Sequence, residues 1–183
     1  MPLAILKDRV GAGSKRQRPV GSRIKACETS RATSLKKESH NVPEKIKIGG
    51  LELEFLHSKA DTAGSLDLFR MTVQPNAKVP APHYHESWDE AVYGLSGTLT
   101  FRIDGQDVAI GPGQSAFIKR GVVHGFRNDT QQPATCLSVL TPGLGPEYFR
   151  EMAALLSTAG PPDLARLKEV MQRYGLIPVA PGT

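Results

Sequence analysis

The stretch LTFRIDGQDVAI, residues 99–110, carries the clearest structural signal in this sequence. Its first half alternates apolar with polar residues, which is typical of a strand with one buried and one solvent-facing side. Asp104 and Gly105 follow at once, and both positions of such a tight turn require a positive φ angle. The stretch therefore predicts a β-hairpin.

The hairpin belongs to a longer series of strand-like runs between Lys45 and Leu140. The other runs are LELEFL, SLDLFRMTV, EAVYGLS, SAFIKR, VVHGFRN and ATCLSVL, and they are separated by residues that favour turns. About eight short strands divided by turns predict an all-β sandwich or barrel. We expect this β domain to span residues 43–142.

Two short helices are expected after the β domain, in residues 143–183, where the hydrophobic period changes from two to about 3.6 residues. Pro146 suits the first position of the earlier helix and Gly160 its end, while Asp163 suits the N-cap of the later helix and Gly175 its end. The expected apolar faces are Phe149, Met152, Ala153 and Leu156, then Leu164, Leu167, Val170, Met171 and Tyr174. The helices should pack on the β domain or cover one of its mouths.

Residues 1–42 differ from the rest in charge. They contain ten Lys or Arg and three acidic residues, a net charge of +7, whereas the other residues sum to −2. The segment has no lasting periodicity, which predicts a basic, flexible N-terminal tail. It also lacks aromatic residues for base stacking, so we expect no nucleic-acid partner.

The cysteine content and the hydropathy of the sequence indicate the cellular compartment in which we expect the protein. Cys27 and Cys136 have no paired spacing, so a disulfide framework is not expected and a reducing cytoplasm fits. No apolar run approaches the ~18 residues of a membrane span. We expect a cytoplasmic protein without a membrane partner.

The residues that carry chemistry begin with HYHESWDE, residues 83–90. His83 and His85 are two apart, so on a strand both imidazoles point to the same face. Glu90 follows across a turn, and His124 lies in a later strand-like run. Three imidazoles and one carboxylate predict one divalent transition metal (Fe first, with Mn, Ni, Zn or Cu as alternatives) and leave coordination positions open for catalysis.

The same residues resemble the two motifs of the cupin superfamily. The first motif is matched by His83, His85, Glu90 and Gly97, with Ala77 in place of its leading glycine. The second is matched by Gly113, Gly121, His124 and Asn128, with Lys119 in place of its proline. The resemblance covers residues 43–142 and is to small single-domain cupins of the quercetin-dioxygenase-like type. It implies a double-stranded β-helix, or jelly-roll barrel, with an internal metal, a small-molecule ligand at one mouth and frequent homodimers.

Several neighbouring residues are candidates for lesser roles. Candidates to line a substrate pocket are Trp88, Tyr93, Phe101, Phe117 and Phe126. Packing at the rim of the barrel explains Trp88 equally well, and core packing is the default explanation for the other four. Asn128 suits a turn or a hydrogen bond behind the metal ligands. Glu86 and Asp89 compete with Glu90 as the carboxylate ligand, and the spacing favours Glu90. Tyr84 should point away from the metal, and His40 and His57 should be structural or solvent-facing.

Three functions fit these residues. The first is an Fe(II)-type dioxygenase of a small organic molecule, such as an aromatic one, with Glu90 as a ligand or as the catalytic base. The second is an isomerase, epimerase or lyase that uses the metal as a Lewis acid. The third is a non-catalytic module that binds or senses a small molecule. A homodimer is expected by fold analogy alone.

Overall fold

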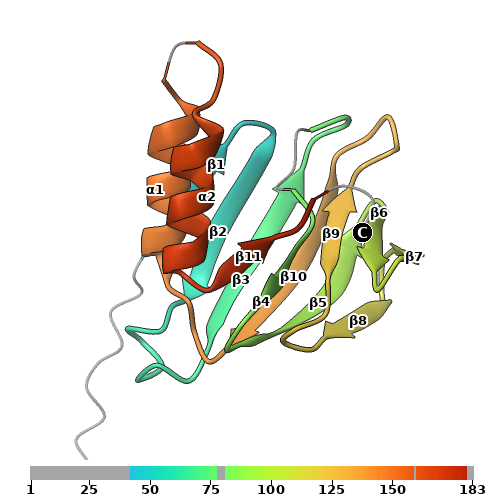
Figure 1. Ribbon diagram of the computed structural model, residues 1–183. Helices are drawn as coiled ribbons and strands as arrows, with labels where there is room; N and C mark the ends of the chain where they lie inside the picture. Colours follow the sequence, from blue (N-terminus) through green and yellow to red (C-terminus); the bar gives the residue numbers. More distant parts are fainter. Residues whose placement is uncertain (1–41, 78–80, 159, 181–183) are drawn as a thin grey trace, which may run out of the picture. The chain divides into compact units, whose positions relative to one another are not determined.

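The computed structural model describes residues 42–77, 81–158 and 160–180. Within these ranges the chain forms two antiparallel sheets and two helices (Figure 1). The expected N-terminal tail lies outside the described residues except for Val42, as do Cys27 and His40.

The larger sheet has six strands in the order β1-β2-β3-β10-β5-β8. These strands are β1 (Glu44–Ile48), β2 (Leu51–His57), β3 (Asp67–Val73), β10 (Ala134–Thr141), β5 (Asp89–Ser96) and β8 (Ser115–Ile118). The smaller sheet has the order β11-β4-β9-β6-β7 and consists of β11 (Leu176–Pro178), β4 (His83–His85), β9 (His124–Arg127), β6 (Leu99–Ile103) and β7 (Gln106–Ile110). The order is far from sequential, so each sheet combines distant parts of the chain.

The core lies where alternate residues of these strands point inward. On β2 and β3 the residues Leu53, Phe69 and Met71 are each at most 4% exposed. On the opposite side of the same strands, Arg70 donates a hydrogen bond of 2.7 Å to Glu54. The period-two alternation of the sequence therefore sorts apolar from charged side chains across the sheet, and burial of the apolar set drives folding.

The predicted hairpin is present between β6 and β7. Asp104 and Gly105 have φ angles of 48° and 75°, and Ile103 pairs with Gln106.

The jelly-roll fold with two C-terminal helices is confirmed. The expected closed barrel is corrected: no ladder of hydrogen bonds joins the edge strands of the two sheets within the described residues. The sheets face each other as two separate layers.

The two predicted helices are α1 (Pro146–Leu156) and α2 (Leu164–Arg173). Pro146 begins α1, and the Asp163 carboxylate caps α2 by accepting a hydrogen bond of 3.0 Å from the Arg166 amide. The expected apolar face of α2 is only partly buried, since Val170 and Met171 are inside while Leu164 is 75% exposed. None of the helices in the described part of the chain is long and apolar enough to cross a membrane.

A buried carboxylate fixes the place where α1 begins. Asp67, which is fully buried, accepts hydrogen bonds of 2.6 Å from the amides of Lys59 and Gly145. The Lys59 ammonium donates a hydrogen bond of 2.8 Å to the Leu144 carbonyl. Gly145 has a φ of 91°, a conformation that L side chains rarely adopt. These contacts set the path of the chain from β10 into α1.

The C-terminal extension also contains a strand that the sequence analysis did not predict. β11 pairs with β4, and Leu176 lies opposite His85 while Pro178 lies opposite His83. The three-residue run is too short for a recognisable period, and it becomes a strand because β4 has a free edge. Two of the candidate metal ligands are thus held between β9 and β11.

Candidate metal centre

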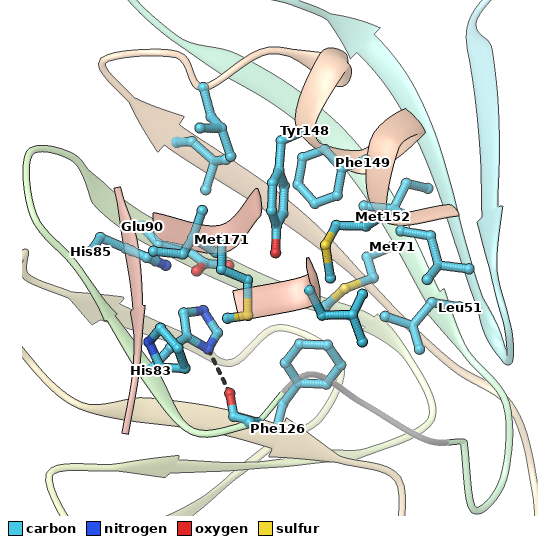
Figure 2. Close-up of a pocket in the computed structure, with 18 of the residues that line it drawn as sticks. Leu51, Met71, His83, His85, Glu90, Phe126, Tyr148, Phe149, Met152 and Met171 are labelled. Atoms are coloured by element: carbon cyan, nitrogen blue, oxygen red, sulfur yellow. Dashed lines mark hydrogen bonds between the residues drawn. The ribbon is translucent and has the colours of Figure 1, made fainter. Parts of the chain in front are cut away.

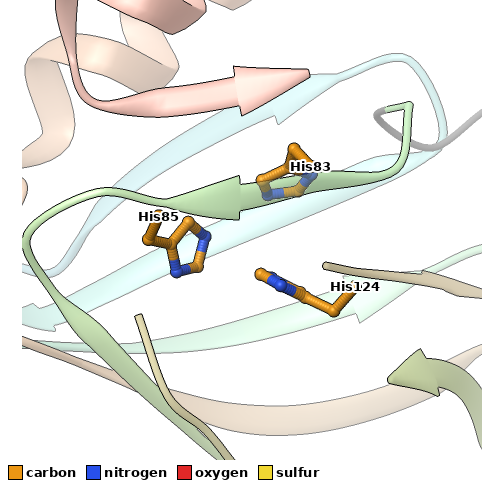
Figure 3. Close-up of side chains that lie close together, drawn as sticks. All are labelled: His83, His85 and His124. Atoms are coloured by element: carbon orange, nitrogen blue, oxygen red, sulfur yellow. The ribbon is translucent and has the colours of Figure 1, made fainter. Parts of the chain in front are cut away.

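Three buried imidazoles meet on the inner face of the five-stranded sheet (Figure 3). His83 and His85 come from the two ends of β4, and His124 begins β9 directly opposite His83. Their side chains are between 1% and 6% exposed. One ring nitrogen from each lies within 4.8 Å of the other two. The strand period brings these three rings together, as the spacing of the sequence requires.

Hydrogen bonds select which nitrogen of two rings is available. The Nδ1 atoms of His83 and His124 lie 2.9 Å and 3.0 Å from the carbonyl oxygens of Ala81 and Val122. A carbonyl can only accept, so in the neutral rings Nδ1 carries the proton and Nε2 keeps its lone pair. This second contact of each ring is the arrangement that orients histidine ligands around a metal.

The third ring has an unsatisfied nitrogen. His85 Nδ1 is buried and has no hydrogen-bond partner among the described residues. Leaving a buried polar atom unpaired is unfavourable, so such an atom indicates that something else binds the ring. A divalent transition metal fits, because it binds neutral imidazole and the three rings are close enough to share it.

The protonation states of the histidines agree with a role as metal ligands. Burial, with the neighbouring His124, lowers the pKa of His83 to about 4 and lowers the pKa of His85 still further. Both rings are therefore neutral at neutral pH, the form that binds a metal. Burial also acts to lower the pKa of His124, but the Glu90 carboxylate beside it outweighs burial and leaves that pKa raised.

Glu90 is the one acidic candidate that lies beside the three rings. Its Oε2 atom is 3.6 Å from Nε2 of His124. The Asp89 carboxylate instead accepts hydrogen bonds of 2.8 Å from the amide and the guanidinium of Arg120, which lower the pKa of Asp89 to about 2. Glu86 is exposed. Glu90 is thus placed to act as a further ligand or to hold a proton next to His124.

The side chain of Trp88 packs against one of the three histidines. The indole of Trp88 stacks on His85, with ring centroids 3.2 Å apart and planes inclined by 20°. Trp88 is 5% exposed, and its Nε1 has no hydrogen-bond partner among the described residues. The stacking limits rotation of the His85 ring, which keeps the ligand geometry fixed.

A cavity of about 430 Å³ opens from the histidines into the space between the sheets and the helices (Figure 2). His83, His85, His124, Trp88 and Glu90 line one part of it, and Leu51, Met71, Phe149, Met152 and Met171 line another. This volume lies within the usual range of small-molecule sites. The cavity therefore combines a candidate metal centre with a largely apolar chamber.

The comparison with protein families agrees with this architecture. Residues 69–140 match the family model described as "Cupin domain", and the match contains both segments that supply the histidines. Residues 69–140 of this chain are therefore similar to a cupin domain. The match runs from β3 to β10, whereas β1, β2, both helices and β11 lie outside it.

Curated relatives match only part of the chain. It is 36% identical over 70 residues to quercetin 2,3-dioxygenase of Bacillus subtilis, which is 38% of this chain and 20% of that protein. It is 31% identical over 94 residues to endoribonuclease YbeY of Myxococcus xanthus, covering 51% of this chain and 31% of that protein. The chain thus spans less than a third of the length of either relative, and the likeness supports a cupin domain rather than a shared activity.

Solved structures extend the same result. A predicted oxalate decarboxylase from Thermotoga maritima has 27% sequence identity and a TM-score of 0.50, covering 56% of this chain and 94% of its own. The three proteins bear the names of three different activities. Similarity to cupins therefore supports the fold and leaves the reaction open.

The five aromatic candidates for the pocket are found in three different places. Trp88 and Phe126 line the cavity. Phe101 is buried against Phe126, with ring centroids 5.6 Å apart, but does not line the cavity. The assignment of Tyr93 and Phe117 to the pocket is corrected: they are 47% and 58% exposed and line a separate, outer depression of the six-stranded sheet.

Asn128 organises a turn. Its amide donates hydrogen bonds of 2.9 Å and 2.8 Å to the carbonyls of Val73 and Gln132. Its oxygen accepts hydrogen bonds from the amide and hydroxyl of Thr130. All of its hydrogen bonds are to this turn and to β3, so it forms none to the histidines.

Tyr148 is a cavity residue that the sequence analysis missed. It is 3% exposed and lines the cavity from α1. It lies four residues before Met152, which places the two side chains on one helical face. Extending the predicted apolar face of α1 by one turn toward its N-terminus would have included it.

Proposed function

We propose that this chain is a metal-dependent enzyme, an Fe(II)-type dioxygenase, that acts on a small apolar molecule held in the cavity. The observation that carries this proposal is that three histidine side chains close enough to share a metal ion line a largely apolar cavity. A bound divalent metal with open positions would supply Lewis acidity and, for iron, electron exchange with oxygen. The partial likeness to quercetin 2,3-dioxygenase of Bacillus subtilis favours this reaction class.

The residues of the chain have separate roles in this proposal. His83, His85 and His124 hold the metal through one nitrogen each. Glu90 lies 3.6 Å from His124 and is placed to hold a proton at the edge of the centre. The apolar walls exclude water and orient the molecule against the metal, which raises the effective concentration of the reacting groups.

The chamber argues against the smallest polar substrates. A small dianion such as oxalate could pair with a metal held by the histidines and with Lys168, but most of the remaining lining is Leu, Met and Phe and would make no polar contact with it. A chamber of this kind gains most of its binding free energy by burying apolar surface, which such a small dianion lacks. We therefore favour an uncharged or weakly polar aromatic molecule over a decarboxylase substrate of that kind.

The first test is the elemental metal content of protein purified without chelators and without a nickel column. About one equivalent of iron per chain, followed by oxygen consumption with phenolic or diketone substrates, is the expected result. About one equivalent of zinc, manganese or nickel without oxygen uptake would replace the dioxygenase by Lewis-acid chemistry. A protein that takes up no metal on reconstitution would contradict the proposal and leave a binding module.

A further inference from the structure

The cavity contains a polar atom that neither the metal centre nor the fold uses. Tyr148 projects from the first turn of α1, and in Figure 2 its hydroxyl points into the cavity, with His85 and Glu90 on one side and Met152 and Met71 on the other. The side chain is 3% exposed, and its hydroxyl forms no hydrogen bond with the described residues.

This unpaired state differs from that of the neighbouring tyrosine. Tyr174 lies against Tyr148, with ring centroids 5.5 Å apart, and its hydroxyl donates a hydrogen bond of 2.6 Å to Glu151. The fold therefore satisfies one of the two adjacent hydroxyl groups and leaves the other facing the cavity. A cavity-facing hydroxyl that no described residue pairs is available to a molecule bound in the cavity.

The ring of Tyr148 is held in place by packing. It contacts Phe149 at a centroid distance of 4.9 Å in an edge-on arrangement, and Tyr174 on another side. The buried carboxylate of Asp67 holds the amide of Gly145, one residue before α1. A side chain fixed in this way presents its hydroxyl in one direction, which reduces the entropy lost when a ligand binds.

We propose that Tyr148 is a ligand-binding residue, and that the molecule in the cavity is apolar with a carbonyl or similar acceptor oxygen that receives a hydrogen bond from the Tyr148 hydroxyl. This inference rests on the proposed function and specifies its substrate class. Burial raises the pKa of Tyr148, so the group remains a neutral donor at physiological pH. A neutral donor in an apolar wall discriminates strongly in favour of a ligand with an oxygen in the matching place.

The test compares two probes of nearly the same shape, acetophenone and α-methylstyrene, in which a carbonyl oxygen is replaced by a methylene group. Binding is measured by calorimetry on the metal-containing protein. Wild type should bind the ketone more tightly, by roughly fivefold to tenfold, as expected for one hydrogen bond. In Tyr148→Phe this preference should disappear while the affinity for α-methylstyrene is retained.

A matched control separates binding from structure. Tyr148→Phe should leave the Tm nearly unchanged, because it breaks no hydrogen bond to the described residues and keeps the ring contacts to Phe149 and Tyr174. Tyr174→Phe breaks the hydrogen bond to Glu151, so it should lower the Tm and keep the ketone preference. Opposite effects of two adjacent Tyr→Phe changes cannot arise from general disturbance of α1.

Other outcomes overturn the inference. Equal affinity of wild type for the two probes, or no binding of either, contradicts it. A ketone preference that survives in Tyr148→Phe means that the carbonyl binds elsewhere, for example at the metal. Metal content measured on the same samples tests the proposed function separately, because Tyr148 is not one of the metal-binding candidates.

Discussion

The two ends of the cavity come from different parts of the chain. The histidine end is built by β4, β5 and β9, all within the residues that match the cupin family. The apolar end is built largely by β2, α1 and α2, which lie outside that match. In the proposed function, the metal site and the part of the cavity that selects the bound molecule therefore come from separate segments, and a substitution in one should leave the other unchanged.

The largest effect should come from His85→Ala at the histidine end. Removing one of three imidazoles should reduce the metal content from about one equivalent to near zero, since the remaining ligands no longer enclose the ion. Binding of α-methylstyrene at the apolar end should persist. Elemental analysis and calorimetry on one preparation measure both, and retention of a full equivalent of metal would refute the ligand assignment.

An intermediate effect is expected from Met152→Trp at the apolar end. The larger side chain should fill part of the chamber and weaken binding of α-methylstyrene by roughly tenfold to a hundredfold through overpacking. The metal content should stay at the wild-type level. Lys119→Trp, in an exposed turn outside the cavity, is the control for adding an indole. Loss of metal in Met152→Trp would show that the two ends are coupled.

The smallest effect should come from Glu44→Gln, which weakens the contact between β1 and α1. Arg150 donates two hydrogen bonds of 2.6 Å to Glu44 and lowers the pKa of that carboxyl from 4.5. Both side chains are partly exposed, so a loss of about 0.2–1 kcal/mol in unfolding free energy is expected.

The pH dependence of this contact has a definite sign. A carboxyl whose pKa is lowered by folding contributes stability above its ordinary pKa of 4.5, and that stability is lost as the pH falls through the lowered value. The difference in unfolding free energy between wild type and Glu44→Gln should therefore be full at pH 7 and shrink in acid. A difference independent of pH would contradict this origin, and the metal content should not change.

The sequence was sufficient where a local pattern determines the structure. The Asp104-Gly105 turn and the start of α1 at Pro146 follow from backbone constraints that hold in any surroundings. The approach of His124 to His83 was anticipated through a resemblance and a strand period, since the pairing of β4 with β9 is not visible in either strand alone.

The sequence predicted less well those features that depend on tertiary packing, such as which aromatic side chains are buried. Tyr93 and Trp88 are both aromatic residues near the ligands, yet one is 47% exposed and the other 5%. Tyr93 lies three residues after Glu90 on β5, so the strand period turns it to the outer face once the bounds of the strand are known. The strand β11 likewise exists only because β4 offers it an edge.

The pairing of β4 with β11 has a consequence for the order in which the protein is made. β4 leaves the ribosome early, but one of its two neighbours is β9 and the other is formed by Leu176–Pro178. Until that last described strand has been synthesised, the strand that carries His83 and His85 has one open edge. Metal loading should therefore follow synthesis, and a nascent chain stalled before Leu176 would present two histidines in a flexible strand that holds the ion poorly.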